Sequence, residues 1–113
     1  MQTRTDLNKW FEQTANIRDL GFCEIQDTRK RIVCKDGTKL SVQASETHYC
    51  QPRVNQNKLQ GMKYYQVEVW RVSCEVPNEW LQYGDPEENP FAYIPIEMVE
   101  DFIDSHGGMW YFD

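Results

Sequence analysis

The chain has 113 residues, of which 40% are hydrophobic and 13% aromatic, enough to build the core of one domain over residues 1–113. The formal net charge is −6, and residues 54–113 hold the excess acid, with three Lys/Arg against eleven Asp/Glu. Such a surface disfavours direct nucleic-acid binding and favours a basic protein surface as a partner. A solvated helix face and an acidic loop would explain the same charges without a partner.

No apolar run approaches the roughly 18 residues of a membrane span, and the first residues lack the apolar segment of a signal peptide. We therefore expect a cytoplasmic protein that does not bind membranes and whose cysteines are reduced. The cysteine spacing argues against a metal site, because structural zinc usually takes closely spaced pairs of ligands. The four cysteines are Cys23, Cys34, Cys50 and Cys74. Glycine-rich nucleotide motifs are absent, and no cofactor is expected.

The first predicted element is an amphipathic helix near the start of the chain. Apolar residues recur at helical spacing from Leu7 to Leu20. Thr5 or Asp6 can cap the start of this helix, and Gly21 stands where a glycine commonly ends one. The pattern predicts a helix that covers one face of a sheet.

A second amphipathic helix is predicted near the end of the chain. It begins at Pro95 and ends at Gly107 and Gly108. Its buried stripe is expected to hold Met98, Val99, Phe102, Ile103 and His106. His106 is interpreted as a cap of the last turn rather than a ligand.

Residues 22–26 and 31–35 are predicted to form a hairpin in which Cys23 faces Cys34. The two cysteines are interpreted as small apolar core residues rather than as a disulfide. The basic residues 29–31 would then lie in a solvated turn, which explains them better than nucleic-acid binding does.

The next turn decides the register of the following strand. A three-residue loop over residues 35–37, with Gly37 left-handed in a bulge, pairs Ile32 with Leu40. That register places Leu40, Val42 and Ala44 on the core face, whereas a two-residue loop would turn them to the other face. We therefore predict the bulged turn.

A fourth strand is predicted over residues 63–72, with aromatic residues on both faces. One face would carry Tyr65, Val67, Val69 and Arg71, and the other Tyr64, Gln66, Glu68 and Trp70. Residues 46–62 form a long polar loop, and residues 73–90 are loop-rich with a helical turn from Pro77 to Trp80. Residues 109–112 either add an edge strand or pack their aromatics on the body. The prediction is an α+β fold with a small antiparallel sheet of about four strands, in the order α-β-β-β-β-α.

The densest group of chemically capable side chains follows the third strand. His48, Tyr49, Cys50 and Arg53 lie within six residues. Binding is one interpretation, in which these residues and several neighbours together line a pocket for a small anionic nucleotide. The neighbours in this interpretation are Ser41, Gln43, Ser45, Tyr64 and Trp70.

Catalysis is a second interpretation, in which Cys50 is a nucleophile and His48 its base. Residues two apart on an extended chain point to opposite sides, so the turn would have to bring them together. A third interpretation is purely structural: Tyr49 and Cys50 close the end of the sheet, while Arg53 and His48 bond loop carbonyls. No second base or carboxylate pair supports an active site, so binding is favoured over catalysis.

The chain resembles a family of small bacteriophage and prophage proteins in several segments. These are Leu40-Ser-Val-Gln-Ala-Ser45, His48-Tyr-Cys50, Pro52-Arg53, Val67-Glu-Val69, Ala92-Tyr-Ile-Pro95 and His106-Gly-Gly108. The resemblance implies phage origin and action inside a bacterial host cell, but it carries over no activity and no functional residues. Small phage accessory proteins often inhibit host machinery, including CRISPR–Cas defence, by stoichiometric binding.

The resemblance and the acidic charge together favour a non-enzymatic binding protein that inhibits a host protein with a basic surface. Its anchors would be aromatic residues of the acidic part that are expected to be exposed. These residues are Trp80, Tyr83, Phe91 and Tyr93. A nucleotide sponge built on residues 48–53 is the alternative, and a Cys50/His48 enzyme the third hypothesis. The oligomeric state stays open, with a homodimer among the options.

Overall fold

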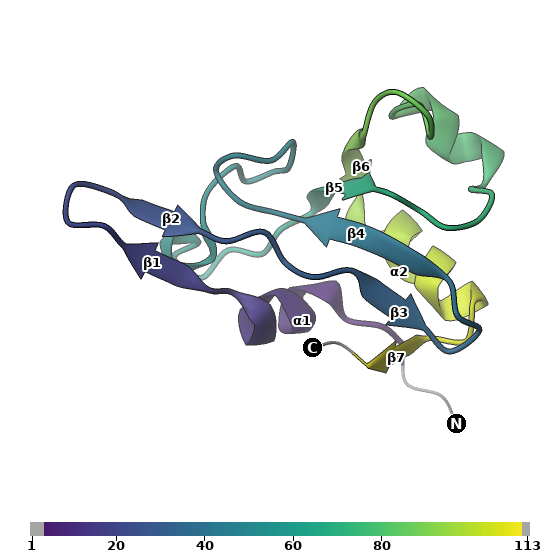
Figure 1. Ribbon diagram of the computed structural model, residues 1–113, viewed down its shortest axis with the longest axis horizontal. Helices are drawn as coiled ribbons and strands as arrows, with labels where there is room; N and C mark the ends of the chain where they lie inside the picture. The colour runs from purple at the N-terminus through teal and green to yellow at the C-terminus, as the bar shows by residue number, and fades with distance from the viewer. Residues whose placement is uncertain (1–3, 112–113) are drawn as a thin grey trace.

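The computed structural model describes residues 4–111, which form an α+β fold of two α-helices and seven strands (Figure 1). The helices are α1 (Leu7–Thr14) and α2 (Ile96–Ser105), with short 3-10 helices η1 (Gln56–Lys58) and η2 (Asn78–Gln82). The strands are β1 (Ile17–Asp19), β2 (Glu24–Gln26), β3 (Ile32–Cys34), β4 (Lys39–Gln43), β5 (Gln66–Trp70), β6 (Phe91–Pro95) and β7 (Met109–Tyr111). Five strands form an antiparallel sheet in the order β6-β5-β4-β3-β7, and β1 and β2 form a second sheet.

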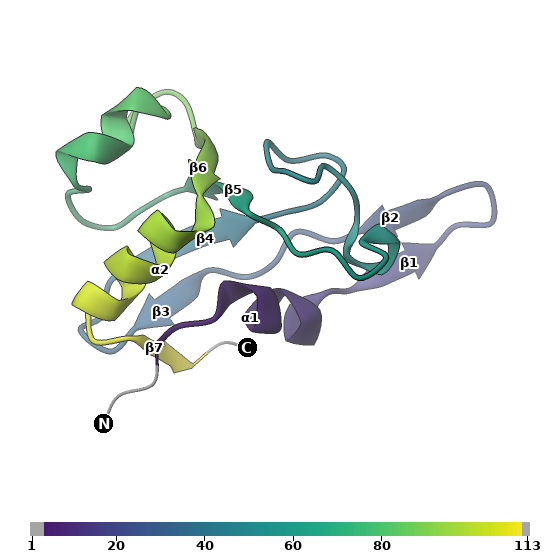
Figure 2. The same cartoon turned by 180° about the vertical axis from the view of Figure 1, so that it is seen from behind.

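Both helices cover the same face of the five-stranded sheet, the face turned to the viewer in Figure 2. Their apolar stripes pack with the inward residues of the strands into one core cluster. Its helical members are Leu7, Trp10 and Phe11 of α1 and Ile96, Val99, Phe102 and Ile103 of α2. Among the described residues, no helix is long and apolar enough to span a membrane. Within residues 4–111, neither α-helix covers the opposite face of the sheet, the face turned to the viewer in Figure 1.

The bulged turn between β3 and β4 is confirmed. Ile32 pairs with Leu40, and the N–H of Cys34 donates to the Thr38 carbonyl at 2.8 Å. Gly37 has a φ of +94°, which only a residue without a Cβ adopts easily. Leu40, Val42 and Ala44 are accordingly all fully buried.

The first helix is shorter than predicted, because it ends at Thr14 rather than near Leu20. The apolar residues that were predicted to continue the helix fall partly in β1, which pairs with β2. We call this pair of strands, residues 17–26, the β1–β2 arm. Asp27 holds the arm together, since it accepts hydrogen bonds from Asn16 at 2.8 Å and Arg18 at 3.0 Å. Gly21 lies in the turn of the arm with φ +90° and does not end a helix.

The predicted hairpin between residues 22–26 and 31–35 is wrong, since β2 pairs with β1. Cys23 is exposed and Cys34 is buried in β3, so the two do not face each other as core neighbours. All four cysteines are free thiols. The physical reason lies in residues 27–31, which run beside β4 as an irregular segment fixed by side chains, as described below.

The strand over residues 63–72 loses its alternation at both ends. Tyr64 is buried and Tyr65 is 53% exposed, the reverse of the predicted faces. The N–H groups of Tyr65 and Gln66 both donate to the Gln51 carbonyl, at 3.0 and 3.4 Å, which shifts the register there. At the other end, Arg71 adopts φ +56° and leaves the face of Val69.

The sequence interpretation missed β6, which pairs with β5, and placed its aromatics on the surface. Trp80 and Phe91 are both 1% exposed, so the expectation that they are exposed anchors is wrong. Their ring centroids lie 5.4 Å apart, and Trp80 also packs on Phe102 at 4.9 Å. Tyr83 and Tyr93 are half-buried. η2 falls on the predicted helical turn, and Trp80 is its buried residue.

The order of elements is therefore α-β-β-β-β-β-β-α-β rather than α-β-β-β-β-α. The second helix follows Pro95 as predicted and ends at Ser105. After Gly107 and Gly108 the chain forms β7 as an edge strand beside β3. Phe112, which was included in that prediction, lies outside the described residues.

Candidate functional site

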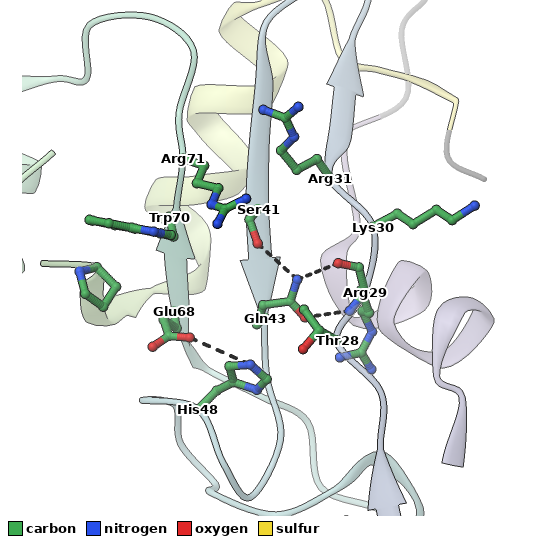
Figure 3. A pocket seen from close by; sticks show the side chains of 11 residues that line it. Thr28, Arg29, Lys30, Arg31, Ser41, Gln43, His48, Glu68, Trp70 and Arg71 are labelled. Carbon is green, nitrogen blue, oxygen red and sulfur yellow. Dashed lines mark hydrogen bonds and ion pairs between the residues drawn. The ribbon is translucent and has the colours of Figure 1, made fainter. Parts of the chain in front are cut away.

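A pocket of about 460 Å³ opens on the face of the sheet opposite to α1 and α2 (Figure 3). Because Val42 of β4 and Val69 of β5 point into the core, their neighbours along each strand point to the opposite face. The pocket is lined by Thr28, Arg29, Lys30, Arg31, Ser41, Gln43, His48, Glu68, Trp70, Arg71 and Pro90. Strand alternation therefore puts Ser41, Gln43 and Trp70 on one face, and His48 of the following loop lines the same pocket. These four are among the residues that the binding interpretation named.

Positive charge dominates this pocket, although the whole chain is acidic. In Figure 3, Arg71 at the end of β5 extends toward Ser41, and Arg31, the residue before β3, extends toward β4. Both arginines are exposed, and within residues 4–111 neither takes part in an ion pair. Lys30 points away from β4 in the same view, and Glu68 is the carboxylate among the lining residues. The two guanidinium groups are thus available to an anion.

Arg29 is the buried member of the basic run and builds the wall of the pocket. It is 5% exposed, so the expected solvated turn over residues 29–31 is wrong at this position. Its guanidinium donates to the carbonyls of Ala44 at 3.0 Å and Phe11 at 3.1 Å, and to Thr14 Oγ1 at 2.9 Å. It also lies 4.6 Å from the centre of the Phe11 ring. Burial lowers the pKa of Arg29 to about 10, and the group stays charged at neutral pH.

Gln43 fixes the same segment to β4. Its Nε2 donates to the Arg29 carbonyl at 2.7 Å, and its Oε1 accepts from the Arg29 N–H at 2.9 Å. A side-chain amide thus replaces the backbone pairing that a regular strand would make here. Nε2 also donates to Ser41 Oγ at 3.0 Å, which orients that hydroxyl in the pocket.

His48, in the loop after β4, lines the basic pocket between β4 and β5 (Figure 3). Its Nδ1 lies 2.6 Å from Ser45 Oγ, and its Nε2 lies 3.9 Å from Glu68 Oε2. Burial, followed by the charges of Arg29 and Arg53, lowers the pKa of His48, while burial raises the pKa of Glu68. The imidazole is therefore neutral at neutral pH. Ser45 is 1% exposed, so its contact with His48 positions the ring and offers no accessible nucleophile.

Two further candidate residues, Cys50 and Tyr64, lie outside the pocket. Cys50 is fully buried, its Sγ donates to the Ser45 carbonyl at 3.2 Å, and burial raises its pKa to about 11. The group is thus held as a thiol, and the geometry gives no support to it as a nucleophile. Tyr64 is also buried, and its hydroxyl donates to the Val54 carbonyl at 2.6 Å. Neither residue lines the pocket.

Arg53 and Tyr49 form a separate surface contact. The Nε of Arg53 donates to the Glu46 carbonyl at 3.1 Å, and its guanidinium lies 5.4 Å from the centre of the Tyr49 ring. Tyr49 is 45% exposed and its ring lies 5.9 Å from that of Tyr93. Arg53 does not line the pocket. This is the arrangement that the structural interpretation expected for Arg53, which bonds a loop carbonyl.

Sequence reasoning missed Arg31 and Arg71 as members of the site. Arg31 was assigned to a solvated turn together with its neighbours. Arg71 was assigned by alternation to the same face as Val67 and Val69, and its left-handed backbone turns it to the side of Trp70. The sequence offered two signals for these residues. Arg31 belongs to a basic run next to a strand, and Arg71 ends an apolar strand. Neither says which face the side chain takes.

Among residues 4–111, no group of three or more His, Cys, Asp or Glu side chains is placed to hold a metal ion. Comparison with models of protein families, with curated proteins and with solved structures finds no match to this chain. The geometry of the pocket is therefore the basis for a proposal about function.

Proposed function

We propose that this protein binds a small anionic ligand of the nucleotide class in the basic pocket, and that it acts there by binding rather than catalysis. The observation that carries the proposal is the pair Arg31 and Arg71, which are exposed, without ion-pair partners among residues 4–111, and on the rim of one pocket. Guanidinium groups bind phosphate through paired hydrogen bonds, which suits this arrangement.

The other lining groups suit the rest of a nucleotide. Trp70 is half-buried on the same face and offers an aromatic surface on which a base can stack. The Ser41 hydroxyl can donate to a phosphate oxygen or accept from a sugar hydroxyl. The Glu68 carboxylate can accept from a base amino group. A volume of about 460 Å³ lies in the range of small-ligand sites.

Inhibition of a host protein by stoichiometric binding is the second candidate. Its support is the exposed apolar surface outside the pocket, where Phe22 at the tip of the β1–β2 arm is 87% exposed. Two of its expected anchors, Trp80 and Phe91, are buried. The small-ligand proposal is therefore placed first.

Thermal shift measurements with ATP, cyclic AMP, cyclic di-AMP and inorganic phosphate test the proposal. At least one nucleotide is expected to raise the Tm, and the rise should shrink with added salt because the contacts are ionic. Arg31→Ala and Arg71→Ala should each weaken the Kd by about ten- to a hundredfold, the value of a charge-assisted hydrogen bond.

Arg53→Ala is the matched control, because this arginine is exposed but lies outside the pocket. It should leave the Kd unchanged. A flat response to every nucleotide would refute the proposal and give priority to the host-protein candidate. An equal loss in the Arg53 variant would show that the ligand binds at the 48–53 loop instead.

A further inference from the structure

Three side chains from distant parts of the chain meet at the end of the sheet that carries the turn between β3 and β4. Asp36 lies in the turn between β3 and β4, Cys74 follows β5, and His106 caps the end of α2. The β3–β4 turn and the end of α2 lie side by side in both views of the fold (Figures 1 and 2). The N–H of Asp36 donates to the His106 carbonyl at 3.2 Å, which joins the two elements.

The imidazole of His106 lies between the other two side chains and contacts both. Asp36 Oδ2 lies 2.5 Å from His106 Nδ1, and His106 Nε2 lies 3.9 Å from Cys74 Sγ. Thr38 supports this chain, because its N–H donates to Asp36 Oδ1 at 2.9 Å and its Oγ1 lies 3.1 Å from His106 Nδ1. The ring of His106 also packs on Phe102, with 4.4 Å between centroids. The imidazole is therefore oriented from both sides.

The carboxylate decides which nitrogen of His106 carries the proton. The N–H of Thr38 and then the contact with His106 lower the pKa of Asp36 to about 2, so the group is ionised at neutral pH. An ionised carboxylate only accepts hydrogen bonds, so Nδ1 must donate to it. In the neutral ring Nε2 is then left without a proton, and it faces Cys74. This is the tautomer that can take a proton from the thiol.

We infer that Cys74 is a nucleophile for acyl transfer, with His106 as its general base and Asp36 as the residue that orients the base. The arrangement matches the order nucleophile, base and orienting carboxylate that such sites share. The sequence interpretation assigned His106 to a helix cap and did not connect Cys74 with any base.

Cys74 differs from the other cysteines because it is both exposed to solvent and in contact with a histidine. It is exposed, whereas Cys34 and Cys50 are fully buried. Burial, with smaller contributions from Asp36 and Cys74, raises the pKa of Cys34 to about 11, so that neighbour stays a thiol. Cys23 is exposed, but within residues 4–111 it has no histidine contact. Cys74 is thus the accessible thiol that has a histidine as neighbour.

A pocket of about 400 Å³ opens beside the thiol and indicates the class of substrate. Its lining includes apolar side chains that suit an aliphatic acyl group, namely Val72, Val76, Leu81 and Pro86. Glu75 and Glu87 also line it, and their charge disfavours an anionic acyl group. The expected substrate is a neutral ester or thioester with an aliphatic acyl chain. None of the three site residues lines the basic pocket.

The reaction balances with water as the second reactant. The Cys74 S–H proton passes to His106 Nε2 while the sulfur forms a bond to the carbonyl carbon of the ester. The carbon–oxygen bond to the leaving group then breaks, and the leaving oxygen takes the proton from His106. Water next adds to the thioester carbon with its proton going to His106. The carbon–sulfur bond then breaks, and the proton returns to the sulfur.

Alkylation by iodoacetamide at pH 7, followed by peptide mass spectrometry, compares Cys74 with Cys23 in one protein. Cys74 should react about a hundredfold faster than Cys23, the usual contribution of a positioned base. His106→Gln should bring Cys74 down to the rate of Cys23 and leave Cys23 unchanged. Equal rates of the two cysteines in the wild-type chain would overturn the inference without any variant.

Asp36→Asn separates an orienting role from a structural one. An amide can donate to Nδ1, which moves the ring proton to Nε2 and removes the acceptor that faces the thiol. In this variant the dependence of the Cys74 alkylation rate on pH should become like that of Cys23, with a lower rate at pH 7. Asp36→Glu should restore part of the rate at pH 7. A profile that does not move would overturn the role of Asp36.

The acyl step is tested with p-nitrophenyl butyrate. The wild-type chain should release nitrophenolate and carry a butyryl group on Cys74, and Cys74→Ala should do neither. Cys23→Ala is the control and should behave like the wild-type chain. If wild-type protein shows neither steady release nor a butyryl adduct at Cys74, the inference is overturned.

Discussion

Arg29 shows how much of the structure can depend on one side chain. It is 5% exposed, and its guanidinium donates hydrogen bonds to neutral groups: two carbonyls, the Thr14 hydroxyl and the Gln56 amide. These groups come from α1, from the end of β4 and from η1, so one guanidinium joins three separate elements. A buried charge is tolerated only when its hydrogen bonds are made, as they are here.

Arg29→Ala should therefore lower the free energy of unfolding by about 2–4 kcal/mol, because it leaves buried carbonyls without donors. Arg31→Ala is the matched control. It removes an exposed arginine two residues away and should change stability by less than about 0.5 kcal/mol. Urea unfolding measures both. Equal midpoints in the two variants would show that the Arg29 network contributes little.

At the scale of elements, side-chain amides take over where strand pairing stops. Gln43 pairs with both backbone groups of Arg29. Gln26 donates to the Ala44 carbonyl at 2.9 Å and accepts from the Gln56 N–H at 2.7 Å, which attaches the arm and the long loop to β4. The segment between β2 and β3 is therefore ordered without being a strand. This segment supplies the basic wall of the pocket.

The start of β6 depends on a close approach at Gly84. A Cβ at this position would lie 2.4 Å from the Pro90 carbonyl oxygen and 2.8 Å from the Phe91 Cα. Both are backbone atoms, so β6 itself would have to move. Gly84→Ala should cost about 1–3 kcal/mol, the range for overpacking.

Glu88→Ala provides the control for Gly84→Ala, since Glu88 is exposed in the same loop. It should leave the unfolding midpoint unchanged. Thermal or urea unfolding reports the difference, and a Gly84 variant as stable as the Glu88 variant would contradict the close approach.

At the scale of the molecule, charge is segregated. The acidic run of the second half is partly used inside the fold, where Asp104 accepts from Thr5 at 2.6 Å and Glu100 from the Leu7 N–H at 2.9 Å. Asp101 pairs with Arg4 at 2.7 Å. These acids bind the start of the chain to α2. Ser41 and Trp70, which line the basic pocket, alternate with the buried Val42 and Val69, so the pocket lies on the face of the sheet opposite to α2.

The two sheets differ in how they are covered, which predicts different local stability. The β1–β2 arm projects from the body and has exposed residues along it, whereas Leu40 and Val42 of β4 are fully buried (Figure 1). Two strands alone are marginal in water, so the arm should open without the rest.

Hydrogen exchange measures this difference amide by amide. The hydrogen-bonded amides of Leu20 in the arm and of Asp27 next to it should exchange at least about a hundredfold faster than those of β4, which open only with the whole domain. Equal protection in the arm and in β4 would mean that the arm unfolds together with the body.

Several features were predictable because local sequence specifies them. Pro95 before an apolar stripe predicts the start of α2, and the turn with Gly37 predicts the pairing of Ile32 with Leu40. Both are confirmed, since the φ of proline is fixed near the helical value and glycine readily adopts the positive φ that the turn requires. The polar face of β4 followed from the same register, which placed Ser41 and Gln43 opposite the core.

Only tertiary structure decided which distant groups meet. The stripe through Ile17 fits a helix as well as a strand, and contacts with Asp27 select the strand. Arg71 reaches the pocket through a backbone angle that alternation does not reveal. The approach of His106 to Cys74 depends on how α2 packs at the end of the sheet. Local sequence determines the element, but the faces that meet depend on packing across the whole chain.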